Sequence, residues 1–143
     1  MAFNIQQINP LDLQPRKAVG VGLPFSSTSV FNSTYSTQDA LKSNLVNHFL
    51  TEKGERYLNP DLGAGLRRLL FDQMTEDKKG EIEAVVRTEI STWFPSLQVT
   101  DVRIVNSPDS NTVTVYINYN VTQTNIQDEL LINFEQQWLK IEI

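Results

Sequence analysis

Cysteine is absent from the sequence of 143 residues, and histidine occurs once, as His48. Without cysteine the chain has no disulfide, no thiolate nucleophile and no cysteine-based metal site. A single histidine leaves a transition-metal site or a serine triad without its usual partners, and Ser43 lies in no Gly-x-Ser-x-Gly motif. We therefore expect His48 to be a packing or hydrogen-bonding residue, and we expect no catalytic, cofactor-binding or metal-binding residues.

Basic residues and long apolar runs are also scarce. The chain has 12 lysines and arginines against 17 acidic residues, a net charge of −5, so it lacks the basic surface that binds nucleic acid. No apolar run reaches the roughly 18 residues that span a membrane, and the segment MAFNIQQINP does not resemble a cleaved signal. Gly63-Ala64-Gly65 lacks the lysine of a phosphate loop. We expect no nucleic acid, membrane or small-molecule substrate among the partners.

A hydrophobic content of 40% over 143 residues is enough for one domain with a substantial core. Residues 1–36 contain Pro10, Pro15 and Pro24 without a sustained period of 2 or 3.6, so we expect an extended N-terminal arm followed by a single domain over residues 37–143. The apolar residues of the arm could dock on the domain or on a neighbouring subunit; they are Phe3, Ile5, Ile8, Leu11, Leu13, Phe25 and Phe31.

Helical spacing is clear in the middle of the chain. Ser36 and Asp39 are spaced like a capping box, which predicts a helix over residues 37–52, with Gly54 as its stop signal. A short helix is expected near residues 63–72, with Met74 on its apolar side, and Thr75 is expected to cap a long helix that ends at Pro95. One apolar stripe runs along this long helix, and the charged residues Glu81, Glu83, Arg87 and Glu89 are expected to face away from it.

The last third of the chain changes to a period of two. Val102 and Ile104 alternate, a turn is expected over residues 107–111, and apolar residues then alternate with polar ones over residues 113–121 and 130–134. The fold predicted is α+β: two main helices plus a short helix packed on a small antiparallel β-sheet, with the extended arm.

The C-terminal segment WLKIEI has the alternation of a strand, with Leu139, Ile141 and Ile143 on one face and Trp138 on the other. Such a strand either completes the sheet of its own domain or offers an edge to another chain. The candidate residues for a partner at this edge are Leu130, Ile132, Phe134, Trp138, Leu139 and Ile141.

A signature over residues 50–71, LTEKGERYLNPDLGAGLRRLLF, resembles one family closely. Gly22-Leu23-Pro24-Phe25 is similar to the family's entry segment, and the likeness spans roughly residues 20–135. The family is the small wedge subunit of contractile-tail baseplates, the sheath initiator of T-even-like phages, whose bacterial relative is the TssE component of type VI secretion. Where relatives often carry Glu-Pro-Arg after the second helix, this chain has Phe94-Pro95-Ser96.

The resemblance implies a structural component of the tail baseplate of a virion, assembled in the host cytoplasm. It implies that the chain joins the inner wedge to the tail sheath, whose first ring it templates by strand addition, within a sixfold hetero-oligomer. Its arm could reach the tail tube or hub. The partners implied are other wedge proteins and the sheath protein; candidate wedge-binding residues are Glu55, Arg56, Arg67, Arg68, Phe94, Pro95 and Ser96.

Alternatives remain beside this reading. Arg56 could instead cap the carbonyl groups that end the first helix, with Glu55 solvated. A lysozyme-like peptidoglycan hydrolase would use a carboxylate pair such as Glu52 with Glu55, or Asp61 with Asp72, although carboxylates at helix ends and turns usually serve as caps. A type VI baseplate component or a regulatory adaptor of the same fold would also fit the sequence.

Overall fold

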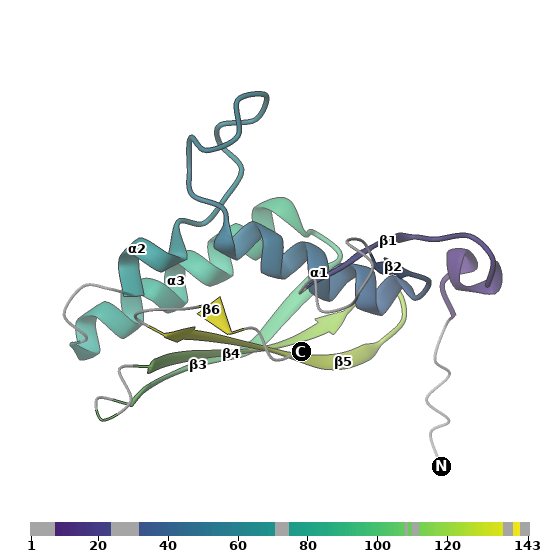
Figure 1. The fold of residues 1–143 in the computed structure, drawn as a ribbon. Coiled ribbons are helices and arrows are strands. Elements are labelled where there is room, and N and C mark those ends of the chain that lie inside the picture. The colour runs from purple at the N-terminus through teal and green to yellow at the C-terminus, as the bar shows by residue number, and fades with distance from the viewer. Residues whose placement is uncertain are drawn as a thin grey trace, which may run out of the picture.

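The hydrophobic core lies between three helices and one face of a four-stranded antiparallel sheet (Figure 1). The computed structural model describes residues 8–23, 32–70, 75–107, 109, 112–135 and 139–140. The predicted α+β class is confirmed. The helices are α1 (Thr37–Leu50), α2 (Leu66–Leu70) and α3 (Glu76–Trp93); the strands of the large sheet are β3 (Leu97–Ser107), β4 (Thr112–Val121), β5 (Ile126–Glu135) and β6 (Leu139–Lys140).

The sheet follows the chain order β3-β4-β5-β6, and every neighbouring pair is antiparallel. Val102 pairs with Ile117, which in turn pairs with Leu130, so three inward-facing residues meet across the sheet. The predicted alternation of residues 113–121 is confirmed in β4, where four alternate side chains are buried: Val115, Ile117, Tyr119 and Val121. A bulge between Val99 and Asp101 keeps Leu97, Val99, Val102 and Ile104 on the core side of β3, whereas Val105 is exposed.

Helix α3 supplies the centre of the helical layer. Ile82, Val86 and Ile90 are buried, and each contributes about 1.5–3 kcal/mol of hydrophobic stabilisation. The hydroxyl of Thr75 accepts a hydrogen bond from the Lys78 N–H at 3.3 Å, which confirms the predicted cap. The expectation that Glu89 faces away from the apolar stripe is wrong, since Glu89 is buried and only 8% exposed.

Helix α1 is shorter than predicted and is capped by a different residue. It runs from Thr37 to Leu50 rather than over residues 37–52, and Ser36 makes no side-chain capping bond. The Asp12 carboxylate instead accepts hydrogen bonds from the N–H and the hydroxyl of Thr37, both at 2.7 Å. A carboxylate fits this position because it meets the partial positive charge of the helix N-terminus.

The described part of the N-terminal arm docks on α1. A short helix, η1 (Pro10–Leu13), carries Asp12, and strands β1 (Gly20–Gly22) and β2 (Asn32–Thr34) form a small antiparallel sheet. The N–H of Leu23 donates to the Ser43 hydroxyl at 3.2 Å. Phe3, Ile5, Phe25, Phe31, Met74, Pro24 of the entry segment and most of the 107–111 turn loop lie outside the described residues. Within the described ranges, no helix is long and apolar enough to cross a membrane.

We expect Asp12→Ala to lower the free energy of unfolding by about 1 kcal/mol, because it removes the only side-chain cap seen at the N-terminus of α1 within the described residues. Urea denaturation followed by circular dichroism measures the change. Ser36→Ala is the matched control and should leave stability unchanged, since the Ser36 side chain makes no capping bond. Equal losses in the two variants would contradict the assignment of the cap to Asp12.

Candidate partner-binding surfaces

The signature segment folds into a loop that projects from the helical layer. Residues 51–65 connect α1 to α2, and Figure 1 shows this projecting loop rising away from the helices on the side opposite the sheet. Its base is closed by two main-chain hydrogen bonds, from Gly65 N–H to Thr51 O and from Ala64 N–H to His48 O, each 3.3 Å long. The loop is therefore anchored to the last turn of α1.

Gly63 allows the two ends of the projecting loop to come together. Its φ is +120°, which side-chain-bearing residues rarely adopt, and an added Cβ would collide with the carbonyl group of Thr51. Glycine is thus required at position 63 for the close approach of the two chain segments. Gly54, predicted to stop α1, lies within the loop instead: Thr51 ends the helix, and the Gly54 N–H bonds to Pro60 O at 2.8 Å.

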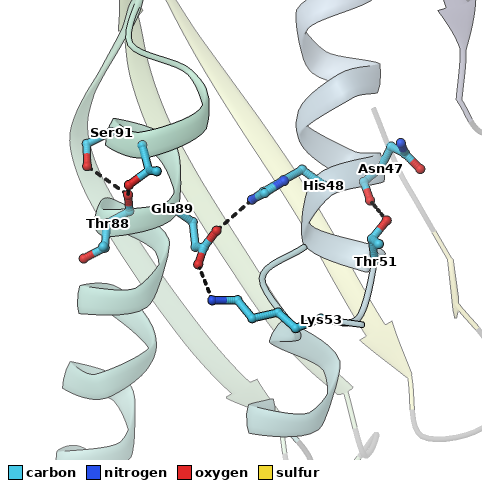
Figure 2. Close-up of polar contacts among 8 residues, drawn as sticks. Asn47, His48, Thr51, Lys53, Thr88, Glu89 and Ser91 are labelled. Atoms are coloured by element: carbon cyan, nitrogen blue, oxygen red, sulfur yellow. Dashed lines mark hydrogen bonds and ion pairs between the residues drawn. The ribbon is translucent and has the colours of Figure 1, made fainter. Parts of the chain in front are cut away.

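A polar cluster around the buried Glu89 joins the projecting loop to both long helices. Figure 2 shows Glu89 of α3 between His48 of α1 and Lys53 of the loop. Glu89 Oε2 lies 3.1 Å from His48 Nε2, and Glu89 Oε1 lies 2.9 Å from Lys53 Nζ. Both carboxylate oxygens therefore have partners, and the buried charge of Glu89 is balanced by the lysine.

His48 has the packing and hydrogen-bonding role predicted for it. Its side chain is 2% exposed, and its ring meets the rings of Phe49, Trp93 and Phe94 at centroid distances of 5.5–6.0 Å. Burial lowers the pKa of His48 below its ordinary value, although the Glu89 carboxylate opposes this shift. The neutral ring donates from Nε2 to Glu89, and this leaves Nδ1 buried without a partner in the described structure.

Among the candidate wedge-binding residues, Glu55 and Arg56 do the opposite of what the capping alternative expected: in the described structure, the Glu55 side chain is hydrogen-bonded and that of Arg56 is not. Glu55 Oε2 accepts a hydrogen bond from the Glu52 N–H at 3.0 Å, so Glu55 holds the turn. The Arg56 side chain is exposed and makes no hydrogen bond or ion pair within the described chain. Arg56 does not cap α1; the hydroxyl of Thr51 meets the Asn47 carbonyl instead.

The remaining wedge candidates lie at two places. Arg56 and Phe94 share a hollow of about 250 Å³ between the projecting loop and the C-terminal ends of α1 and α3. Arg67 and Arg68 are exposed on α2, where Arg68 borders a second hollow of about 530 Å³ between α2 and α3. Arg68 Nε is 3.9 Å from Glu52 Oε2, a surface contact that contributes little to stability.

Phe94, Pro95 and Ser96 form the connection from α3 to β3. The Phe94 N–H bonds to Ile90 O at 2.8 Å and closes the helix before Pro95, as predicted. The Ser96 carbonyl accepts two hydrogen bonds from Thr122, from its N–H at 3.0 Å and from its hydroxyl at 2.5 Å. The turn is therefore held to the β4–β5 connection by hydrogen bonds to the Ser96 carbonyl, which need no flanking charges.

The candidate sheath-binding residues that the structure describes lie on β5 and β6. The side chains of Leu130, Ile132 and Phe134 are 0–2% exposed and fill the core, so a partner at this edge would meet the main chain of β5. Leu139 pairs with Phe134 in β6, whereas Trp138 and Ile141 lie outside the described residues.

Asp128 fastens the other end of α1 to β5. Lys42 Nζ lies 2.9 Å from its Oδ1, and the Gln38 amide donates to Oδ2 at 2.6 Å. Burial alone would raise the pKa of Asp128, but the hydrogen bonds from Gln38 and Lys42 outweigh it and hold the pKa below its ordinary value. Tyr119 lies beside the same carboxylate, and burial together with that charge raises the pKa of its phenol.

Comparison with known protein families identifies the family of this chain. The model of the baseplate wedge protein gp25 family matches residues 36–126, well over half of the chain. The chain belongs to this family. The resemblance carried by the 50–71 signature is thereby confirmed, and this gp25-family chain is a structural component of a contractile-tail baseplate.

Solved structures share the gp25 fold at low sequence identity. A Geobacter sulfurreducens protein provisionally assigned as a tail lysozyme aligns with a TM-score of 0.63 at 24% identity, over 70% of this chain and 91% of its own. A chain of the anti-feeding prophage baseplate, solved with sixfold symmetry, aligns with a TM-score of 0.58 at 22% identity, over 69% and 79% of the two chains. No curated protein matches the sequence.

Three features of these surfaces were not foreseen from the sequence. Asp12 and Asp128 act on residues 25 and 90 positions away, distances that no local pattern reports. Glu89 occupies a position of α3 that binary patterning assigns to solvent, and the one sequence feature that could have indicated its burial is the lone His48, which it contacts.

Among the described residues, groups of His, Asp and Glu that could hold a metal ion are absent.

We expect Gly63→Ala to lower the free energy of unfolding by more than about 1 kcal/mol, because it combines an unfavourable φ with a clash against Thr51. Denaturant unfolding of the full chain measures the loss. Gly80→Ala in α3 is the matched control: open space surrounds Gly80, and alanine favours a helix, so this variant should be as stable as the parent or more stable. Similar stability of the two variants would contradict the requirement for glycine at position 63.

Asp128 should give the chain a pH-dependent stability. Because its folded pKa lies below the unfolded value of about 3.9, its contribution is complete above that value and disappears as pH falls through the folded pKa. Asp128→Asn should therefore cost about 1–2 kcal/mol at pH 7, and the gap between variant and parent should close in acid. Unfolding curves at several pH values, with the exposed Asp61→Asn as control, measure this; a gap independent of pH would contradict it.

Proposed function

We propose that this wedge protein joins the inner baseplate wedge to the tail sheath and templates the first sheath ring by adding a strand to its own sheet. It acts as one copy per wedge in a sixfold virion baseplate, as the sixfold anti-feeding prophage baseplate suggests. A phage tail and a type VI apparatus would use the same geometry. The observation that carries this proposal is that, among the described residues, β6 covers only two positions of the β5 edge.

The edge of β5 is suited to strand addition. In the described chain, β6 pairs with only Asn133 and Phe134, so residues 126–132 have a strand neighbour on the β4 side alone. Their apolar side chains already fill the core, as Leu130 and Ile132 show. A sheath strand would therefore be held by main-chain hydrogen bonds, the mode in which an extended peptide joins an open sheet edge.

The two kinds of partner would approach different sides of the molecule. The projecting loop and α2 rise from the helical layer, opposite the sheet, whereas the β5 edge belongs to the sheet itself (Figure 1). We assign the helical side, with Arg56, Arg67 and Arg68, to other wedge proteins and the sheet edge to the sheath. Arginine favours such contacts because its planar head pairs with a carboxylate through two hydrogen bonds. We assign the tail tube or hub to the N-terminal arm.

Templating makes and breaks no covalent bond, and its free energy comes from buried apolar area and edge hydrogen bonds. A peptidoglycan hydrolase would need a carboxyl group free to transfer a proton to the glycosidic oxygen. The buried acid beside the larger hollow is Glu89, and both of its oxygens are held, by His48 and Lys53. This arrangement favours a structural role for Glu89.

The test removes residues 136–143, which deletes β6 and keeps the β5 edge that would receive the sheath. The shortened chain, mixed with the wedge and sheath proteins of the same tail, should therefore join the wedge and still start sheath polymerisation, as seen by negative-stain microscopy. Val105→Lys alters the opposite edge strand, β3, at an exposed side chain and should behave like the parent. Loss of sheath growth in either folded variant would refute templating at the β5 edge. Circular dichroism confirms that both variants are folded.

A further inference from the structure

Two large apolar side chains at the tip of the projecting loop are almost completely exposed. Tyr57 is 96% exposed and Leu58 is 95% exposed, whereas no other exposed large apolar residue of the described chain exceeds 68%. A single exposed leucine is common on protein surfaces, but two adjacent residues without any covering contact form a small apolar patch. Figure 1 shows the projecting loop extending well away from the helices.

The exposure is imposed by a loop that is bonded internally. Main-chain hydrogen bonds run from Glu55 N–H to Glu52 O at 3.1 Å, from Asn59 N–H to Arg56 O at 3.3 Å and from Leu62 N–H to Asn59 O at 3.2 Å. The ion pair between Lys53 and Glu89 fixes the ascending side of the loop to α3. The tip is thus held in one shape before any partner arrives, which reduces the conformational entropy lost on binding.

A cation without a partner stands directly beside the patch. Arg56 precedes Tyr57, and its guanidinium makes no ion pair within the described structure. Two acids of this region are engaged elsewhere: Glu55 holds the Glu52 N–H, and Glu89 holds Lys53 and His48. The hollow that Arg56 borders contains Trp93, Phe94 and the amides of Asn44 and Asn47, a lining that suits a carboxylate-bearing side chain.

We propose that Tyr57 and Leu58 form an anchor that inserts into an apolar pocket of another wedge protein, while Arg56 binds a carboxylate at the rim of that pocket. This inference rests on the assignment of the helical side to the wedge. A projecting pair of side chains fits a concave surface, and tyrosine and arginine, with tryptophan, are enriched among the residues that dominate binding energy near the centre of an interface. The patch alone is too small for a stable complex, so it acts as one anchor within a larger contact.

The anchor is tested on the full chain with the purified wedge proteins of the same tail. Tyr57→Ser combined with Leu58→Ser should weaken binding at least about 30-fold in biolayer interferometry, the loss typical of two interface anchors. Ile8→Ser combined with Leu13→Ser is the matched control, since both residues are 68% exposed and lie outside the loop. This control should bind like the parent, and thermal unfolding should be unchanged in both double variants. Parent-like affinity of the tip variant would overturn the proposal.

The chemistry of the partner is tested by cross-linking and charge reversal. Tyr57→benzoylphenylalanine in an assembling tail should cross-link, under light, to a wedge-protein peptide that contains Asp or Glu. Arg56→Glu should weaken binding at least about tenfold, and lysine in place of that partner carboxylate should restore it. Cross-linking to a second copy of this chain, to sheath alone or to nothing would overturn the inference.

The two proposals fail in distinguishable ways. If the tip variant joins the wedge and starts the sheath like the parent, the anchor is refuted while sheath templating stands. If the parent chain itself joins neither wedge nor sheath, the proposed function is refuted.

Discussion

The buried carboxylate of Glu89 is the constraint on which the helical side of the molecule depends. A charge at that depth is stable only when it is paired, and its two partners come from two other segments, His48 from α1 and Lys53 from the projecting loop. One side chain therefore fixes the positions of α1, α3 and the first turn of the loop together. The shape of the loop, and with it the orientation of its tip, follows from this cluster and from the tight closure at Gly63.

The sheet side is organised by a different principle. Its core is a meander of consecutive antiparallel strands whose inward side chains meet in register, and it contains few charges apart from Asp128. Asp128 ties α1 to β5 through Lys42 and Gln38, and these contacts use its side chain rather than the main chain of β5. The molecule thus separates two tasks: ionic contacts position its helical surface, and hydrophobic packing supports its sheet edge.

Most of the fold could be predicted because its signals are local. The stripe of α3, the Thr75 cap, the stop at Pro95 and the alternation of β4 all depend on neighbours within a few residues. The capping of α1 could not be predicted from Ser36 and Asp39, since the bonded carboxylate is Asp12. Glu89 was misjudged because patterning assigns charge to solvent, and only the three-dimensional pairing with Lys53 reverses that rule. For the surfaces, the 50–71 signature covers the segment that forms the projecting loop, but the exposure of Tyr57 and Leu58 depends on how the loop turns.

The contact between Gln38 and Asp128 spans 90 residues, and this separation affects the order in which the domain can form. On a ribosome, α1 emerges long before β5, so its N-terminal turn has no acidic partner on the sheet while the intervening residues are being made. The hairpins formed by β3, β4 and β5 need only short loops to close and can pair as soon as they appear. The strand proposed to receive the sheath is thus among the last parts of the domain to be synthesised. The apolar face of β5 is accordingly exposed for only a short time before the helices, which are already synthesised, cover it.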